Sequence, residues 1–153
     1  MTNRAQKIFI AIVIIGVCFL FVLGVLVGAA VVGWRSALRA GNEAATIQNL
    51  KSIAVVEVEY FNTHERTFGT LDQLISEQLL SAKFAGHPTG ADGYVLTLAV
   101  TRKSDGSSWY KITADPRDER EGTRHFYLDS EDDRIHVNSE HEAGPNDPLE
   151  SGT

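Results

Sequence analysis

Residues 8–34 form one uninterrupted apolar segment that contains no charged residue and no proline. A helix of this length extends about 40 Å, whereas the hydrocarbon core of a bilayer is about 30 Å thick. Its hydrophobic residues fall on every face of such a helix, which is typical of a membrane span. The pattern therefore predicts a transmembrane helix over 8–34, after a short basic N-terminus over 1–7. The alternative is a cleaved signal peptide, but its apolar core is usually only about 7–15 residues long.

The helical pattern continues over 35–61, which contains no proline and is rich in Ala, Leu, Glu and Gln. We expect this helix to be continuous with the transmembrane helix, with a weak point at Gly41, because Gly is a poor helix former. One apolar stripe recurs at intervals of three or four residues, and it comprises Ile47, Leu50, Ala54, Val58 and Phe61. This stripe predicts the helix-to-sheet packing face. Lys51, Glu57 and Glu59 lie off it.

The second half of the chain predicts one short helix and several strands. Thr70 and Gln73 have the spacing of a capping box, which predicts a helix over 71–80. Turn-forming residues, including Asp92-Gly93, dominate 81–93. Beyond them the apolar period changes to two, which predicts strands over 94–102, 109–115, 124–129 and 134–138. Because the links are short, the strands should pair antiparallel.

Together these elements predict an α+β fold, in which a long N-terminal helix packs on an antiparallel sheet of about four strands. The transmembrane helix is then followed by one α+β domain over 35–138. Residues 139–153 are polar and acidic and contain two prolines, so we expect them to form a flexible tail.

The charge distribution restricts the partners of the α+β domain. Lys and Arg number 14 and Asp and Glu number 20, but only Arg4 and Lys7 precede the apolar segment, so the remainder carries a formal charge of −8. Such a surface repels phosphate groups, which argues against a nucleic-acid partner. Arg4, Lys7 and the α-amino group precede the span, whereas Arg35 and Arg39 follow it with Glu43 close by. With this small difference the positive-inside rule favours a cytoplasmic N-terminus and an external domain.

Small residues in the apolar segment offer a candidate helix–helix interface. Gly24 and Gly28 form a G-x-x-x-G pair, and Ala29 and Gly33 repeat the same spacing. Such a surface lets a second helix approach closely, so self-association through the transmembrane helix is one hypothesis. The alternative is that glycine is simply common in membrane helices.

No motif in the sequence indicates catalysis or a cofactor. There is no G-x-S-x-G, H-E-x-x-H, P-loop or paired-cysteine motif, so we expect a non-enzymatic protein without a cofactor. His125 and His136 fall on neighbouring predicted strands, but no metal-ligand spacing supports a zinc site. A calcium candidate is the acidic turn formed by Asp129, Glu131, Asp132 and Asp133, although it lacks the spacing of a calcium loop.

Several phrases resemble type IV pilins and type II secretion pseudopilins, and in particular the short pilin-like proteins of acidobacteria and deltaproteobacteria. The phrases lie between residues 42 and 149, and they include NEAA (42–45), LKSI (50–53), FGTLDQL (68–74), YKITADP (110–116) and GTRHFYLD (122–129). The resemblance implies a single-pass protein of the bacterial inner membrane with a periplasmic head. It also implies a structural or accessory role in a pilus or secretion apparatus, with other pilin-like or assembly proteins as partners.

The chain departs from these families at their most diagnostic position. No glycine-ended leader precedes the apolar segment, and no glutamate follows at the fifth mature position, where the families carry one. We therefore expect no prepilin-peptidase processing and a permanent anchor. Two alternatives remain open: a membrane-tethered binding or sensing module outside any filament, and a true pilus subunit with an atypical leader.

Overall fold

The computed structural model describes residues 2–85 and 89–151. Helix α1 runs from Thr2 to Thr63, so helical structure continues through Gly41 as expected. The chain divides into two compact units, of which the first comprises Met1–Ala37 and the second Leu38–Thr153. We call the second unit the head.

The first unit consists of the N-terminal part of α1, which carries the predicted membrane span. Large apolar side chains are exposed from one end of the span to the other, with Ile8 at 57% and Trp34 at 74%. One helix in the described part of the chain is therefore long and apolar enough to cross a membrane, and none of its most apolar stretch is buried within the protein. This finding agrees with the predicted span.

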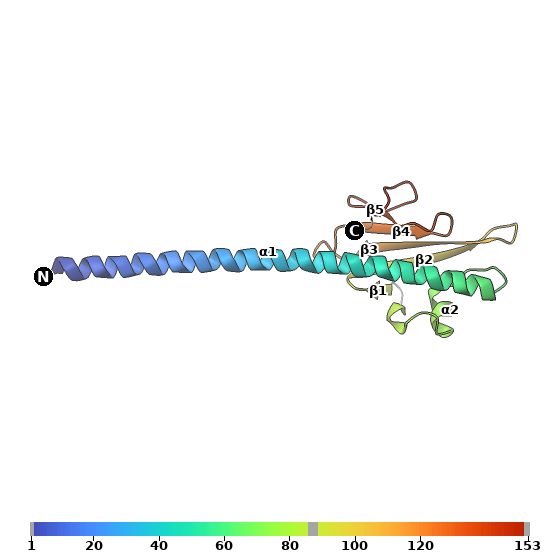
Figure 1. Cartoon of the computed structure of the whole chain (residues 1–153), viewed down its shortest axis with the longest axis horizontal. Helices are drawn as coiled ribbons and strands as arrows, with labels where there is room; N and C mark the ends of the chain where they lie inside the picture. The colour runs from blue at the N-terminus through green and yellow to red at the C-terminus, as the bar shows by residue number, and fades with distance from the viewer. Residues whose placement is uncertain (1, 86–88, 152–153) are drawn as a thin grey trace. The chain divides into compact units, whose positions relative to one another are not determined.

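The head is an α+β structure, which confirms the predicted fold class. After α1 come two short helices, α2 (Leu71–Ser76) and the 3₁₀ helix η1 (Ala82–Phe84), and then five strands. The strands are β1 (Thr89–Ala91), β2 (Tyr94–Arg102), β3 (Ser108–Pro116), β4 (His125–Asp129) and β5 (His136–Asn138). They form one sheet in the order β1-β2-β3-β4-β5, and every neighbouring pair is antiparallel (Figure 1).

Strand β1 adds a fifth strand to the four that the sequence predicts. It pairs with the start of β2 through a tight hairpin, in which Ala91 lies opposite Tyr94. The two residues between them, Asp92 and Gly93, have φ of 51° and 80°. Positive φ at both central positions is the requirement of a type I′ hairpin turn, which Asp-Gly meets well. The predicted turn is therefore present, and it joins two strands.

The elements that the sequence predicts agree with the structure apart from their ends. The capping box is confirmed, because the Thr70 hydroxyl accepts from the Gln73 amide and the Gln73 side chain accepts from the Thr70 amide. The helix that follows ends at Ser76 rather than at residue 80. The chain reverses through Gln78, where φ is 61°, so the last predicted turn does not form.

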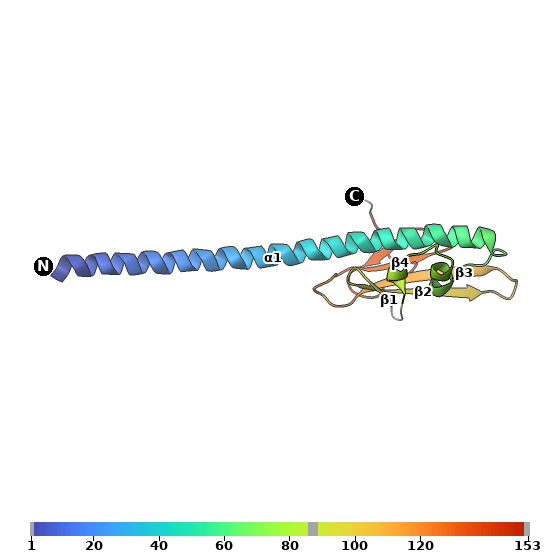
Figure 2. The same ribbon diagram turned by 90° about the horizontal axis from the view of Figure 1, so that it is seen from below.

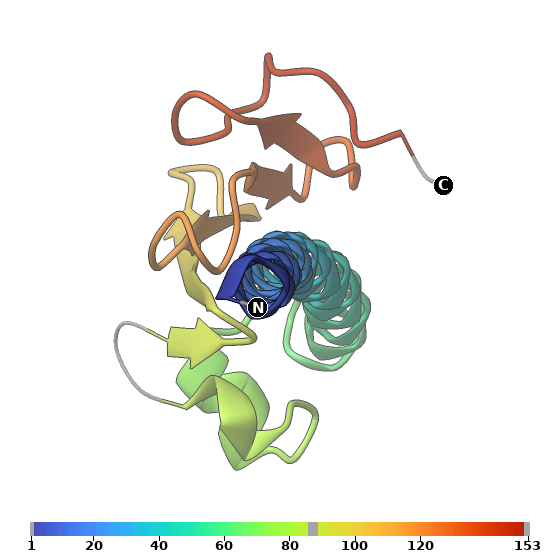
Figure 3. The ribbon, with the colours of Figure 1, turned by 90° about the vertical axis from the view of Figure 1, so that its left-hand side faces the viewer.

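The later part of α1 lies along one face of the sheet (Figures 2 and 3), and the core of the head consists of side chains from both. Leu50 and Ile53 of α1 are fully buried, and so are Tyr94, Ile112 and Phe126 of the sheet. On α1 the buried positions recur three or four residues apart, and they are Glu43, Thr46, Asn49, Leu50, Ile53, Ala54, Glu57 and Tyr60. Polar residues therefore make up half of the buried face of the helix.

The predicted packing stripe is correct at some positions and wrong at others. Leu50 and Ala54 are buried, and Ile47 packs against the core, but Val58 is exposed. The prediction that Glu57 lies off the packing face is also wrong, because its side chain is fully buried. A prediction from hydrophobicity alone turns Val58 inward. In the structure Glu57 takes the buried position, where its carboxyl group accepts a hydrogen bond.

The C-terminal segment differs from the expected flexible tail. His136 and Leu149 form an isolated bridge, the Val137 amide donates to the Pro148 carbonyl at 2.8 Å, and the Glu150 amide donates to the Ile135 carbonyl at 2.8 Å. These hydrogen bonds align the segment with β5. Its polar composition predicts disorder because little apolar surface is available for burial, but backbone pairing and the ion pair between Glu150 and Arg124 hold it in place.

Candidate functional site

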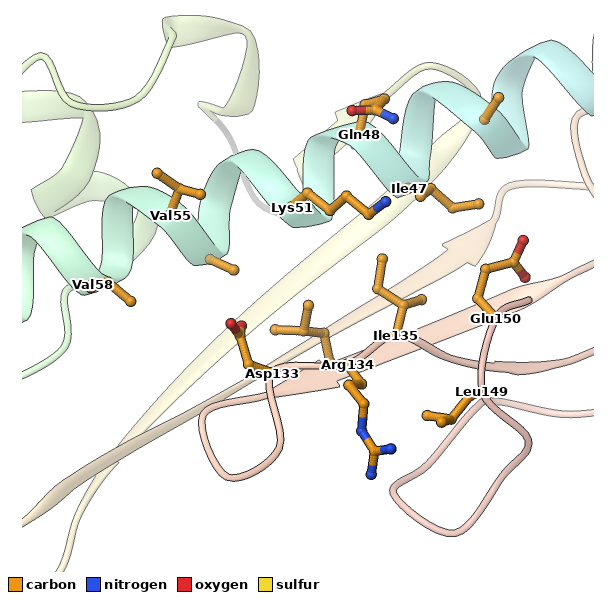
Figure 4. Close-up of a pocket in the computed structure, with 13 residues that line it drawn as sticks. Ile47, Gln48, Lys51, Val55, Val58, Asp133, Arg134, Ile135, Leu149 and Glu150 are labelled. Atoms are coloured by element: carbon orange, nitrogen blue, oxygen red, sulfur yellow. The ribbon is translucent and has the colours of Figure 1, made fainter. Parts of the chain in front are cut away.

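A groove runs beside α1 in the head (Figure 4). It has a volume of about 720 Å³. One wall consists of α1 residues, which are Ala44, Ile47, Gln48, Lys51, Ala54, Val55 and Val58. The other wall consists of the end of β4, the turn that follows it and the C-terminal segment, with Leu128, Asp133, Arg134, Ile135, Leu149 and Glu150. The groove therefore lies between segments far apart in sequence.

The lining of the groove combines apolar surface with a few charges. Val55 is 68% exposed, Val58 51% and Leu149 43%, so these apolar side chains are open to solvent. Lys51 lies on the α1 wall and Asp133 on the opposite wall. Within the part of the chain that the structure describes, neither residue takes part in an ion pair. An apolar surface with a few charges is typical of a protein–protein contact.

A three-residue ion network ties α1 to the loop between β3 and β4 and to the C-terminal segment. The Arg124 Nε donates to Glu43 Oε2 at 2.7 Å, and Arg124 Nη1 donates to Glu150 Oε2 at 2.8 Å. Thr123 donates its backbone amide to Glu43 Oε1 at 3.0 Å. Burial raises the pKa of Glu43, but the Thr123 amide and the Arg124 guanidinium outweigh it and hold that pKa below its usual value. Glu43 therefore stays ionised while almost fully buried.

A second buried carboxyl group, that of Glu57, has fewer partners. Its Oε2 accepts a hydrogen bond from the Gly69 amide at 2.9 Å. Its Oε1 is buried and has no hydrogen-bond partner among the described residues. Burial raises the pKa of Glu57 to about 7, against a smaller lowering by the Gly69 hydrogen bond. This residue thus titrates near neutral pH.

In the acidic turn that is the calcium candidate, carboxylate oxygens of Asp129 and Asp132 take part in hydrogen bonds within the protein. Asp129 Oδ2 accepts from the Tyr127 hydroxyl at 2.7 Å, and Asp129 Oδ1 accepts from the amides of Glu131 and Asp132 at 2.8 and 3.3 Å. Asp132 Oδ2 lies 2.9 Å from His136 Nε2. Among the described residues no group of three or more His, Cys, Asp or Glu side chains is arranged to hold a metal ion.

His136 and His125 each pair with a carboxylate rather than with each other. His136 Nε2 lies 2.9 Å from Asp132 Oδ2, and His125 Nδ1 lies 2.6 Å from Asp115 Oδ1. The other ring nitrogen of His136, Nδ1, lies 2.7 Å from the Asp147 carbonyl oxygen. Burial lowers the pKa of His136, but the Asp147 carbonyl and the Asp132 carboxylate outweigh it and raise that pKa overall. His125 therefore links β4 to β3, and His136 links β5 to the C-terminal segment.

The small residues of the predicted helix–helix interface lie in the first unit. A methyl group added at Gly24, Gly28 or Gly33 meets nothing within 4 Å. Ala29 is exposed as well. These positions are therefore free of contacts within the described chain, and the helix–helix hypothesis stays a prediction.

Comparison with known proteins identifies no relative. No protein family, no curated protein and no solved structure matches this chain. The resemblance to pilins thus stays an interpretation of sequence phrases.

The sequence did not predict the groove, the Glu43–Arg124–Glu150 network or the burial of Glu57. The ion network joins Glu43 to a residue about eighty positions later, so no local pattern reports it. One signal for Glu57 was present, because its position continues the three-and-four spacing of Leu50 and Ile53. A packing face predicted from helical spacing alone, with polar residues counted as well as apolar ones, would include Glu57.

Proposed function

We propose that this chain is a non-enzymatic, single-pass membrane protein whose anchor carries a small α+β head. The observation that supports the proposal is that α1 supplies both an exposed apolar segment and, further along, the buried helix of the head. Exposed apolar side chains on every face of a helix need lipid or protein to cover them. An anchor is the function that this arrangement supports best.

The proposed location is a bacterial inner membrane, with the N-terminus in the cytoplasm and the head in the periplasm. Arg4, Lys7 and the α-amino group before the span support this orientation, because Glu43 offsets part of the charge of Arg35 and Arg39 after the span. Protease added to intact spheroplasts should digest the head. Protection of the head until the membrane is permeabilised would contradict the orientation.

The proposed role is that of a structural or accessory component in a system like a type IV pilus or a type II secretion apparatus. The pilin-like phrases of the sequence support this role, and so does a long N-terminal helix whose later part packs on an antiparallel sheet. Tagged protein purified from membranes should carry pilus or secretion assembly proteins with it. Co-purification of unrelated envelope proteins alone would contradict this role.

The groove beside α1 favours a second candidate function, that of a membrane-tethered binding module. Its exposed valines, together with Lys51 and Asp133, would contact the partner. A photo-crosslinking amino acid at Val55 should capture that partner in cells, whereas the same group at the exposed Thr101 of β2 serves as the matched control. Equal labelling from both positions would contradict a role for the groove.

A further inference from the structure

Glu57 lies where the connection between α1 and α2 (residues 64–70) packs against α1. Its side chain has no exposed surface. The partner of its one hydrogen bond, Gly69, is itself tightly enclosed, because a methyl group added there would lie 3.0 Å from Leu74 and 3.1 Å from the Tyr60 ring. The carboxyl group is therefore sealed from water by the connection to which it is bonded.

The hydrogen bonding of this carboxyl group is incomplete. A buried carboxylate is normally satisfied by several donors or by a cation, since an ionised group loses its hydration on burial. Here one oxygen accepts from the Gly69 amide and the other, Oε1, has no partner in the described part of the chain. The enclosed site accommodates a neutral carboxyl group better than a charged one.

The groups that α1 and the sheet present toward Glu57 do not compensate for a negative charge. Its electrostatic neighbours are Tyr60 on α1 and Tyr110 on β3, and burial raises the pKa of both phenols, so both are neutral near pH 7. The other charges that act on Tyr110 are acidic as well, and they belong to Asp129 and Asp133.

The connection and α2 supply no cation to Glu57 among the described contacts. His64 stacks on Tyr60, but its Nε2 lies 2.9 Å from Glu77 and so serves that carboxylate. The guanidinium of Arg66 lies over the Phe61 ring, 5.9 Å from its centroid. Both basic side chains of the connection are thus engaged elsewhere.

We propose that Glu57 is a pH-dependent latch, which holds the connection between α1 and α2 closed while its carboxyl group is neutral and favours opening of the connection when the proton is lost. The geometry behind this proposal is the full burial of the side chain, its single hydrogen bond to the connection and the absence of a cation partner among the described residues. It is independent of the role proposed above for the whole chain.

The direction of the pH effect follows from proton linkage. The pKa of Glu57 is about 7 when the site is closed, against 4.5 for an ordinary glutamate, which the opened site would resemble. Between these values the closed form binds more protons than the open form, so each rise in pH favours opening. Below pH 4.5 and above about pH 7 the equilibrium constant for opening does not change with pH. Over the whole window, which is about 2.5 pH units wide, the opening equilibrium should change by roughly 300-fold.

Opening would expose an aromatic side chain of the connection that packs against α1 and β3 in the closed form. The Phe68 ring stacks on Phe61 with centroids 4.6 Å apart, and it meets the Tyr110 ring edge-on at 4.7 Å. Phe68 directly precedes Gly69, and its amide donates to Ser108 Oγ at 3.2 Å, so opening of the connection breaks this hydrogen bond together with the ring contacts. The head would then present more apolar surface at neutral pH than in acid.

Amide hydrogen exchange of the full-length protein in a non-ionic detergent tests the latch. The intrinsic exchange rate of an amide rises tenfold per pH unit because the reaction is catalysed by hydroxide. For an amide that exchanges only when the site opens, the observed rate is the intrinsic rate multiplied by the equilibrium constant for opening. Between about pH 5 and about pH 6.5 the logarithm of the Gly69 exchange rate should therefore rise with a slope near two in the wild type. In Glu57→Gln, which cannot ionise, the slope should be near one.

Two further variants assign the effect to Glu57. Glu59→Gln changes an exposed carboxyl group on the same helix and should keep the wild-type slope. His64→Gln removes the contact between the connection and Glu77, and it too should keep a slope near two. A wild-type slope of one, or a slope of two that survives in Glu57→Gln, would overturn the latch.

A direct titration covers the case in which Glu57→Gln does not fold. Carbon-13 NMR of the wild-type protein should show the Glu57 carboxyl group titrating near pH 7. Titration near 4.5, the ordinary glutamate value, would overturn the proposal, because the closed site would then tolerate the charge.

Discussion

Arg124 is the residue on which the attachment of three segments depends. Its guanidinium bridges Glu43 of α1 and Glu150 of the C-terminal segment, and it precedes β4 directly. A planar guanidinium with several donors is suited to two carboxylates at once, which the compact ammonium of lysine is not. Since Glu43 is only 8% exposed, its charge relies on this partner.

Arg124→Gln should lower the free energy of unfolding of the head by about 2 kcal/mol at neutral pH, because it leaves Glu43 ionised and without its cation. The difference in free energy of unfolding between the wild type and Arg124→Gln should be smaller at acidic pH. The pKa of Glu43 is depressed in the folded state, so its contribution is present above the ordinary value of 4.5 and disappears as the pH falls through the folded value. Urea unfolding at neutral and at strongly acidic pH measures both effects, and Arg120→Gln, which changes an exposed arginine in the same loop, is the control.

Gly122 allows the closest approach between the β3–β4 loop and the core. A methyl group added there would overlap the hydroxyl of Tyr94 and lie 2.6 Å from its Cζ. Tyr94 is fully buried, and its hydroxyl donates to the Arg124 carbonyl at 2.9 Å, so the ring has little room to move. Gly122→Ala should therefore destabilise the head by about 2–3 kcal/mol.

Thermal unfolding measures the effect of Gly122→Ala. Gly144→Ala is the matched control, because its added methyl group would meet only Asp147 Oδ2, at 3.9 Å. Equal melting temperatures for the two variants would contradict the close contact.

At the level of elements, local patterns predicted those parts of the fold that a few neighbouring residues determine. Alternation predicts β2 with its bounds unchanged, since Tyr94, Leu96 and the residues that follow keep a period of two. The capping box locates the start of α2, because Thr70 and Gln73 satisfy each other's amides. Both signals lie within a few residues, so no knowledge of the rest of the chain is needed.

The parts that the sequence did not predict depend on contacts between distant residues. The spacing of Leu50 and Ile53 on α1 turns Glu57 inward, but the donor that its carboxyl group finds there, the Gly69 amide, comes from a later segment. The C-terminal segment is placed by pairing with β5 and by Glu150, neither of which composition reports. The groove beside α1 follows from that placement, so it was not predictable either.

The candidate helix–helix interface of the first unit gives a prediction of its own. Gly28→Leu should weaken self-association of the membrane helix, because a large side chain prevents the close approach that small residues permit. Gly16→Leu, outside the small-residue motif, should leave association unchanged. A reporter assay of helix pairing in a bacterial membrane measures the difference. Equal signals from both variants would favour the alternative, in which these glycines reflect membrane composition.

At the level of the whole molecule, the exposed apolar part of α1 predicts how the chain partitions between membrane and water. The wild-type protein should stay in the membrane pellet after extraction with alkaline carbonate, because a spanning helix is not released by high pH. Leu20→Arg places a charge near the middle of the span, which costs about 2.5–3.5 kcal/mol on insertion, and should lower the inserted fraction. Release of the wild-type protein into the supernatant would contradict the anchor.

The pairing of Leu149 with His136 has a consequence for the solubility of the head. A strand at the end of a sheet carries unpaired amides and carbonyls that recruit strands from other molecules. Here the chain's own later residues occupy the outer edge of β5, so this edge is shielded from strands of other molecules. A chain that stops at Gly144 should lose that shield and, in detergent, form oligomers at concentrations where the intact chain scatters little light.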